Sequence, residues 1–127
     1  ALNDAYKMAD LYWPGQLTLV LPVKRSSFDS LNPGSGTVGM RIPDCQLARK
    51  LLLESGPLAT TSANLSGQNP FIEAEATSAI FPDLPLLGPL PWPTPSGLAS
   101  SVIEWERSGS WRLLRKGAVI PESVLIS

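Results

Sequence analysis

The chain has 127 residues, of which 43% are hydrophobic and 17% charged, a composition typical of one globular domain. Its net charge of −1 excludes a global basic field for nucleic acid, so any RNA contact would have to be local. The sequence contains no histidine, which excludes Ser-His-Asp and Cys-His catalysis and histidine metal sites.

The lone cysteine and the first residues bear on the compartment. Cys45 cannot form an internal disulfide or a zinc cluster by itself, and we interpret it as a small residue early in a helix rather than a reactive thiol. The start ALNDAYKMADLYW is polar where a signal peptide would be apolar, and no apolar stretch reaches transmembrane length. We expect a soluble, cytoplasmic protein with no membrane partner. Because the chain begins without methionine inside a predicted helix, we expect residues 1–127 to be a single domain that lacks its N-terminal part.

The first segment changes from a helical to a strand pattern. A helix is predicted to end at Pro14-Gly15, and its expected inner face consists of Leu2, Ala5, Ala9 and Tyr12. Residues 16–21 alternate as a strand closed by Pro22, with Leu17, Leu19 and Leu21 on one face. Residues 23–36 form a polar loop rich in turn residues.

A second strand and helix are predicted in the middle of the chain. In the strand 37–42, alternation directs Val38, Met40 and Ile42 to the core and Thr37, Gly39 and Arg41 to the opposite face. The following helix is expected to start at an Asp44 N-cap, to end near Ser55 at Gly56, and to turn Leu47, Leu51 and Leu52 inward.

The next segment is predicted as a short buried strand over residues 58–61, the polar turn 62–67 and a helix over 72–80. Residues 82–97 hold six of the thirteen prolines, which excludes ordinary helix and favours a pinned loop or edge segment over a flexible linker.

The last segment is predicted to be a hairpin of strands 101–106 and 111–115 with a four-residue loop. Trp105 and Trp111 flank the loop, and we favour their packing as a cross-strand pair over base stacking. The mixture of strands and helices predicts an α/β (α+β) domain with a twisted mixed sheet and flanking helices.

Candidate site residues carry hydroxyl, amide and guanidinium groups. Thr37 and Arg41 share a strand face on either side of Gly39, and arginine is a natural partner of carboxylate or phosphate. Ser62 and Asn64 follow the short strand 58–61, where α/β folds often place ligand loops. An exposed surface arginine and a turn that bonds its own backbone are the structural alternatives.

Five segments, in order, resemble motifs of YrdC-like domains. They are WPGQLTLVLP, TVGMRIPD, GPLATTSANLSG, SGLASSVIEW and LLRKGAVIP, and they span most of residues 11–121. The resemblance implies a YrdC-like open α/β fold and a threonylcarbamoyl-AMP synthase, which makes L-threonylcarbamoyladenylate from L-threonine, bicarbonate and ATP for tRNA modification.

The resemblance also implies the roles of single residues. The ATP-binding residues would be Thr37, Asn64 and Arg115, and the threonine-binding residues would be Arg41, Ser62 and Ser100. No catalytic side chain is expected, because positioning and neutralisation of phosphate charge, with Mg²⁺, can drive nucleotidyl transfer. The expected partners are the substrates, the tRNA threonylcarbamoyl-transferase machinery, and tRNA or double-stranded RNA.

Three departures from the family pattern and two alternative functions remain open. The family's upstream Lys-x-Arg pair has no match, and we interpret Lys24-Arg25 as solvated charges. Ile72 stands where the family often has Ser or Thr, and Ser101 stands where it usually has Thr. The alternative functions are a non-catalytic RNA- or nucleotide-binding module and the carbamoyl-transfer domain of hydrogenase maturation.

Overall fold

The computed structural model describes residues 1–24, 34, 36–59, 79–80, 83 and 98–125. The elements in these ranges are α1 (Leu2–Tyr12), β1 (Leu17–Pro22), β2 (Thr37–Met40), α3 (Gln46–Ser55), β3 (Ser101–Arg107), β4 (Ser110–Arg115) and α5 (Glu122–Leu125). The predicted turn 62–67 lies outside the described residues, and so does the proline-rich loop except for residue 83. Of the predicted helix 72–80, only residues 79 and 80 are described, and both are helical.

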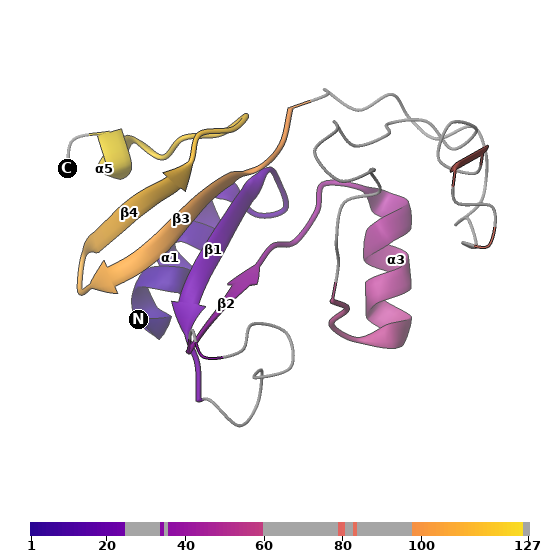
Figure 1. The fold of residues 1–127 in the computed structure, drawn as a ribbon, viewed down its shortest axis with the longest axis horizontal. Helices are drawn as coiled ribbons and strands as arrows, with labels where there is room; N and C mark the ends of the chain where they lie inside the picture. Colours follow the sequence, from indigo (N-terminus) through magenta and orange to yellow (C-terminus); the bar gives the residue numbers. More distant parts are fainter. Residues whose placement is uncertain (25–33, 35, 60–78, 81–82, 84–97, 126–127) are drawn as a thin grey trace.

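The four strands form one mixed sheet in the order β2-β1-β3-β4 (Figure 1). β1 pairs antiparallel with β2 and parallel with β3, and β3 and β4 form an antiparallel hairpin. This architecture confirms the predicted α/β class with a mixed sheet.

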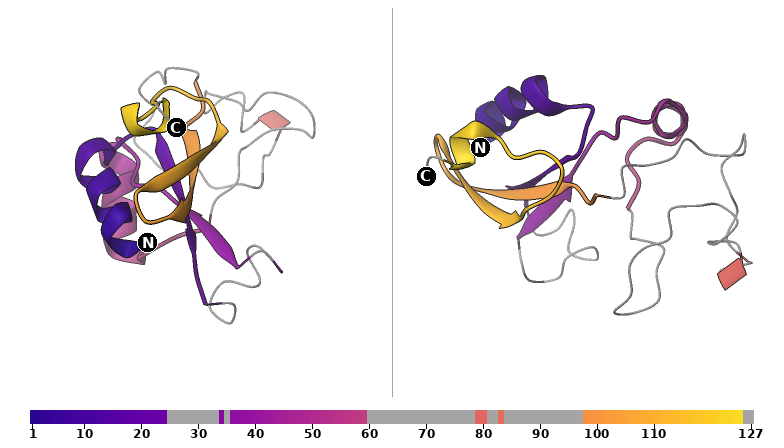
Figure 2. Two further views of the ribbon diagram at one scale, coloured as in Figure 1. Left: turned by 90° about the vertical axis from the view of Figure 1, so that its left-hand side faces the viewer. Right: turned by 90° about the horizontal axis from the view of Figure 1, so that it is seen from above.

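One face of the sheet is covered by α1, and α5 lies on the same side (Figure 2). Strand alternation directs Leu17 and Leu19 of β1 and Ile103 of β3 to this face, where all three are fully buried. The residues of the core cluster are Ala5, Met8, Leu17, Leu19, Ile103, Trp111 and Val124. The core therefore lies between α1 and the centre of the sheet, and the polar positions of β1 point to the other face.

The helix α1 ends just before Pro14-Gly15, as predicted, but its buried stripe differs from the predicted one. Ala5 and Met8 are buried, whereas Leu2 is 62% exposed. A 3.6-residue period permits two overlapping stripes that share Ala5, and contact with the sheet selects the one that contains Met8. The predicted inward position of Leu2 is therefore wrong.

The strand β2 is shorter than predicted, because it ends at Met40 instead of Ile42. Val38 is half-buried, but Met40 and Ile42 are exposed, so the expected core row is only partly formed. β2 is the edge strand next to β1, while α1 lies behind β1 and β3 (Figure 1). The helix therefore leaves the β2 edge outside the core.

The helix α3 starts later than predicted and stands beyond the β2 edge (Figure 1). Its N-cap is Cys45, which is exposed, and not Asp44, whose carboxylate instead pairs with Arg49 at 3.5 Å. Gly56 ends the helix with a φ of 77°, as predicted. No residue of α3 is fully buried. Leu47 and Leu52 are half-buried, whereas Leu51 is exposed, so the predicted inward position of Leu51 is wrong.

The predicted buried strand 58–61 is not formed at its described residues. Leu58 and Ala59 have no strand pairing, and Leu58 is 49% exposed. A short apolar run such as Leu58-Ala59 does not by itself predict a strand, because a strand also needs a neighbouring strand to pair with.

The C-terminal hairpin is confirmed with a tighter turn than predicted. Arg107 pairs with Ser110, so the turn is the two residues Ser108 and Gly109. Gly109 has a φ of 75°, a conformation that glycine adopts without steric cost and that suits two-residue hairpins. Trp105 and Trp111 are cross-strand partners, as predicted, and both contribute to the core region.

Candidate functional site

The candidate site lies at the end of the sheet where β1 and β3 begin. These two strands are parallel, with Leu17 opposite Ser101, so their first residues lie side by side. The amide of Ser101 donates to the carbonyl of Gln16 at 3.0 Å and extends this pairing by one step. Because β2 and β4 run antiparallel to their neighbours, their last residues reach the same end. The topology therefore gathers Arg41, Thr18, Ser100 and Arg115 from four neighbouring strands or their ends.

Ser100 lies at the centre of this group and is 9% exposed. Its hydroxyl lies 2.8 Å from the hydroxyl of Thr18 on β1, and either oxygen can be the donor. Thr18 occupies the β1 face opposite the buried Leu17 and Leu19, as strand alternation requires. The two hydroxyls thus meet on the face that does not carry α1.

Arg115 at the end of β4 is docked on Ser100 by three hydrogen bonds. Its Nε donates to the carbonyl of Ser100 at 3.0 Å, and its Nη2 donates to the same carbonyl at 2.8 Å and to the hydroxyl at 3.0 Å. A guanidinium carries five N–H groups, so the two on Nη1 have no partner among the described residues. No described acidic side chain pairs with Arg115. The arginine is held rigidly while part of its donor capacity and its charge remain available.

The segment after Arg115 closes tightly on the start of β3. Gly117 donates its amide to the Ser101 hydroxyl at 2.8 Å, and Ala118 donates to the carbonyl of Ala99 at 3.0 Å. A Cβ on Gly117 would lie 2.3 Å from the Ala99 carbonyl oxygen, a distance that real Cβ atoms do not adopt. Glycine is therefore required at this position because two backbone segments approach closely.

Gly39 on β2 lies against the Thr18 side chain. A Cβ at this position would be 3.3 Å from Cγ2 of Thr18 and 3.8 Å from Cγ2 of Val20. The glycine at this position therefore leaves room for the threonine methyl group.

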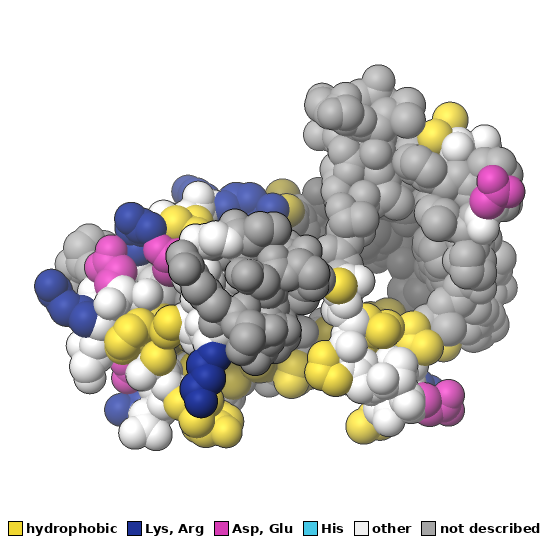
Figure 3. Space-filling model, turned by 60° about the horizontal axis from the view of Figure 1, so that its bottom comes forward, with side chains coloured by type: hydrophobic (Ala, Val, Ile, Leu, Met, Phe, Trp, Pro, Cys, Tyr) yellow, Lys and Arg dark blue, Asp and Glu magenta, His cyan; other side chains and the backbone are white. Residues whose placement is uncertain are grey.

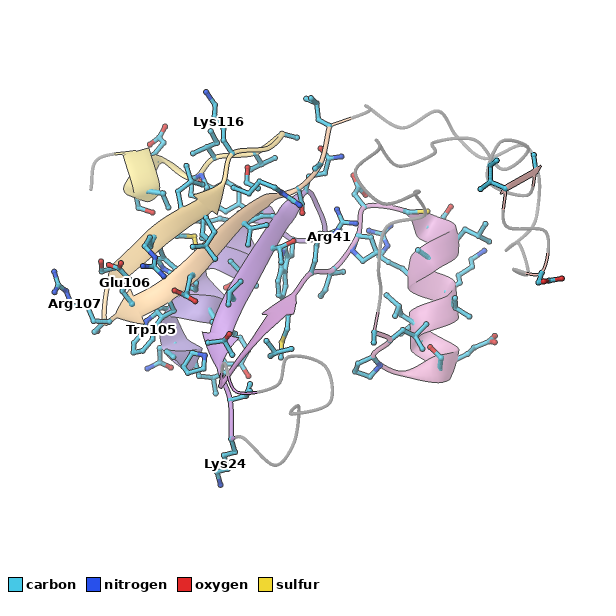
Figure 4. The ribbon with its side chains drawn as sticks, viewed as in Figure 1. Lys24, Arg41, Trp105, Glu106, Arg107 and Lys116 are labelled. Carbon is cyan, nitrogen blue, oxygen red and sulfur yellow. The ribbon has the colours of Figure 1, made fainter. Side chains whose placement is uncertain are left out.

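Arg41 follows β2 and lies near the start of β1 (Figure 4). The amide of Gly15 donates to the carbonyl of Ile42 at 2.8 Å, which holds the end of this segment beside β1. The Arg41 side chain is exposed, and no described carboxylate forms an ion pair with it. Figure 4 shows Lys116 at the same end of the sheet, whereas Lys24 and Arg107 lie toward the other end.

Thr37 is separated from the group around Ser100. It pairs with Pro22 at the end of β1, while Met40 pairs with Leu19 nearer the start. Thr37 and Arg41 therefore lie at opposite ends of β2, and a ligand that touched both would have to run along the strand.

Ser62 and Asn64 lie outside the described residues. The structure accordingly describes Thr37, Arg41, Ser100 and Arg115 among the predicted site residues, and it brings Ser100 and Arg115 into direct contact. It adds Thr18 and Ser101, which were not predicted as site residues. The alternation of WPGQLTLVLP already places Thr18 opposite the leucines, so its orientation, though not its partner, could have been found.

The charged side chains of the described residues form a few ion pairs and no candidate metal site. Arg112 pairs with Glu104 and with Glu106, and Figure 3 shows charges of both signs close together on the side that carries the hairpin. The residues that the structure describes contain no group of three or more acidic or cysteine side chains able to hold a metal ion. Among these same ranges there is also no helix with the length and apolarity needed to span a membrane.

A groove on the helix-covered side is separate from the Ser100 group. Residues of α1, the hairpin and α5 line it: Asp4, Lys7, Met8, Leu11, Tyr12, Gly109, Trp111, Glu122 and Ser123. None of them belongs to the predicted site. The polar cluster on the other face remains the better candidate for recognition of a charged small molecule, because it combines a buried hydroxyl with a guanidinium.

Comparison with known proteins gives consistent matches. The sequence model of the Sua5/YciO/YrdC family, described as telomere recombination, matches residues 2–117. A putative threonylcarbamoyl-AMP synthase of Mycobacterium tuberculosis is 32% identical over 122 residues, which are 96% of this chain and 56% of that protein. The threonylcarbamoyl-AMP synthase of Bacillus subtilis is 49% identical over 80 residues, which are 59% of this chain and 22% of that protein.

A solved structure has the same fold. The crystal structure of P. abyssi Sua5 complexed with L-threonine aligns with a TM-score of 0.76 and 32% sequence identity over 91% of this chain and 34% of that one. The chain therefore spans about half the length of the mycobacterial relative and about a third of the P. abyssi protein.

Proposed function

Because the chain belongs to the Sua5/YciO/YrdC family, we propose that it forms part of a threonylcarbamoyl-AMP synthase. The proposed reaction joins L-threonine, bicarbonate and ATP into L-threonylcarbamoyladenylate and releases water and pyrophosphate. The names of the relatives and the threonine complex of P. abyssi Sua5 support this substrate set. The observation that carries the proposal is the docking of Arg115 on Ser100, which leaves charge and N–H donors for an anionic ligand.

The proposed roles follow the chemistry of each group. Arg115 uses its remaining N–H groups on the phosphates of ATP, since a guanidinium suits bidentate contact with phosphate oxygens. Ser100 contacts threonine through its hydroxyl, and Arg41 pairs with the threonine carboxylate. These groups bind and orient the reactants and offset negative charge as pyrophosphate leaves, so no histidine base is needed.

Three further residues are proposed to contact ATP or threonine. Thr37 contacts the nucleotide, and the ligand would extend along β2 to reach it. Ser62 contacts threonine and Asn64 contacts ATP. These three assignments rest on the family motifs alone.

Mg²⁺ is proposed as a companion of ATP. The hydrogen-bonded group of Thr18, Ser100 and Arg115 contains no carboxylate, so it does not fit a protein-held magnesium ion. The ion would instead be carried by the triphosphate.

The product would be used in the threonylcarbamoylation of tRNA adenosine, with the transferase machinery as the downstream partner. Direct RNA contact would have to rely on local cations, because the net charge is only −1. We also propose that this chain is one part of the domain and that activity needs further sequence that the longer relatives possess.

The test is threonine- and bicarbonate-dependent release of pyrophosphate from ATP. It compares the 127-residue chain with the full-length protein, meaning the product of the complete reading frame around this sequence. We expect turnover in the full-length protein that disappears when threonine is omitted, and little or none in the 127-residue chain. A silent full-length protein that threonine and ATP also fail to stabilise against heat would refute the synthase assignment.

A further inference from the structure

We propose that Thr18 is a positioning residue for Ser100, and that Gly39 is needed to keep the Thr18 side chain in the required orientation. The proposal deepens the function above and rests on it, because it concerns the site that Ser100 and Arg115 form. Thr18 matches none of the predicted ligand contacts.

The first step of the argument is the hydrogen-bond capacity of the Ser100 hydroxyl. A hydroxyl donates once and accepts twice. Arg115 Nη2 donates to Ser100 Oγ at 3.0 Å and occupies one acceptor site. Thr18 Oγ1 lies 2.8 Å from the same oxygen, and either atom can be the donor. In the proposed arrangement Thr18 donates and occupies the second acceptor site. The O–H of Ser100 then remains for a ligand.

A serine whose lone pairs are both occupied can only donate. The group it recognises is therefore a hydrogen-bond acceptor, such as an oxygen of a carboxylate or a phosphate. Without the Thr18 hydroxyl, Ser100 could rotate and donate elsewhere, because no other described residue contacts its Oγ apart from Arg115. The Thr18 contact thus selects the direction of the Ser100 proton.

The second step concerns the space beside Thr18. Its Cγ2 methyl would lie 3.3 Å from a Cβ on Gly39, which is tighter than ordinary van der Waals contact. An alanine would press on the methyl group, which would have to give by a few tenths of an ångström, and in the proposed arrangement it does so by a small turn about χ1. Since Cγ2 and Oγ1 share the same Cβ, this turn would also displace the hydroxyl relative to Ser100 and weaken their contact.

The experiment uses four variants of the full-length protein: Thr18→Val, Thr18→Ser, Gly39→Ala and the double variant Gly39→Ala/Thr18→Val. Valine keeps the branched shape and removes the hydroxyl, whereas serine keeps the hydroxyl. KM and kcat are measured separately for threonine and for ATP.

We expect Thr18→Val to raise one KM about tenfold, with kcat nearly unchanged, and Thr18→Ser to stay within about threefold of the wild type. A raised threonine KM assigns the ligand of Ser100 to threonine, as proposed above, whereas a raised ATP KM assigns it to ATP and contradicts that contact. As a single variant, Gly39→Ala should raise the same KM. Added to Thr18→Val, it should change that KM little further, because the hydroxyl is already absent. Equal effects of valine and serine, or full additivity of Gly39→Ala, would overturn the proposal.

A second measurement separates this proposal from the synthase assignment. The Arg115 Nε–H signal in a nitrogen–proton NMR spectrum reports the guanidinium docked on Ser100. We expect Thr18→Val to shift this signal and Thr18→Ser to leave it close to its original position. If the wild type has no threonine-dependent turnover, the synthase assignment fails, and an unmoved Arg115 signal in Thr18→Val would independently refute the positioning role.

Discussion

The carboxylate of Asp4 on α1 accepts a hydrogen bond from the indole Nε1 of Trp105 on β3 at 2.9 Å. The same carboxylate oxygen accepts a second bond from the amide of Gly109 in the hairpin turn at 2.8 Å. One side chain of the first helix thus ties together a strand and a turn that lie 101 and 105 positions away in the sequence. The contact fixes where the β3–β4 hairpin sits against α1, and it does so far from the Ser100 group.

The Asp4 contacts predict a pH dependence of stability. The Gly109 amide and then the Trp105 indole lower the pKa of Asp4 below its ordinary value of 3.8. A lowered carboxylate pKa contributes stability that is fully present above the unfolded pKa and lost as pH falls through the folded one. Chemical denaturation of Asp4→Ala and wild type should therefore show a difference in unfolding free energy that is constant above pH 3.8 and shrinks below it.

The control for that prediction is Asp10→Ala on the same helix, where the side chain is exposed. It should show no comparable loss at neutral pH. A difference between Asp4→Ala and wild type that grows on acidification would contradict the predicted direction.

Burial in the core predicts a large effect at β1. Leu19 is 0% exposed, whereas Leu53 on α3 is 87% exposed, so the same substitution probes two environments. Leu19→Ala should lower the free energy of unfolding by about 2–5 kcal/mol, because it removes buried methyl groups and leaves a cavity. Leu53→Ala should change it by no more than about 0.5 kcal/mol, as exposed substitutions usually do. Equal losses in urea denaturation would show that α3 packs against a surface in the full-length protein.

The close approach at Gly117 predicts a destabilised site. Gly117→Ala places a methyl group against the Ala99 carbonyl and the backbone of Ser100 and Ser101, none of which can move as a side chain can. We expect the free energy of unfolding to fall by about 1–3 kcal/mol, as is typical of overpacking. Lys116→Ala is the matched control, since its exposed side chain lies next in the sequence. Retention of wild-type stability by Gly117→Ala would mean that residues 116–118 are not held against β3.

The position of Arg41 predicts a selective loss of threonine use. Arg41→Ala in the full-length protein should raise the threonine KM about 30- to 150-fold, equivalent to about 2–3 kcal/mol for a lost charged hydrogen bond. The ATP KM should change much less. Arg107→Ala removes an exposed arginine toward the other end of the sheet and should leave both values unchanged (Figure 4). Unchanged threonine dependence in Arg41→Ala would remove this residue from the proposed site.

Local sequence patterns predicted the structure correctly where the environment of a residue depends only on its own segment. The alternation of Leu17 and Leu19 identified the core face of β1, and Pro14-Gly15 and Gly56 marked the ends of two helices. The cross-strand pair of Trp105 and Trp111 also followed from the short turn between them. Strand and helix periods are intrinsic to the backbone, so a single stretch of sequence contains this information.

The burial of α1 and β2 side chains was decided by the tertiary structure. Leu2 and Met8 both fit a helical stripe, and only the docking of α1 on the sheet buries Met8. Met40 alternates correctly but lies on the edge strand, away from the helix. Hydrophobic patterns predict which residues are able to be buried, whereas the neighbour that covers them comes from elsewhere in the chain.

The sequence by itself determined the family motifs, the mixed α/β class and the hydroxyl and arginine character of the candidate site. The contact of Ser100 with Thr18 and Arg115 required the tertiary structure, because Thr18 and Ser100 are 82 positions apart and meet only when β1 and β3 pair in parallel. Their register, Leu17 opposite Ser101, brings the two hydroxyls to 2.8 Å. A shift of one residue would send one of them to the other face, since successive side chains of a strand point in opposite directions.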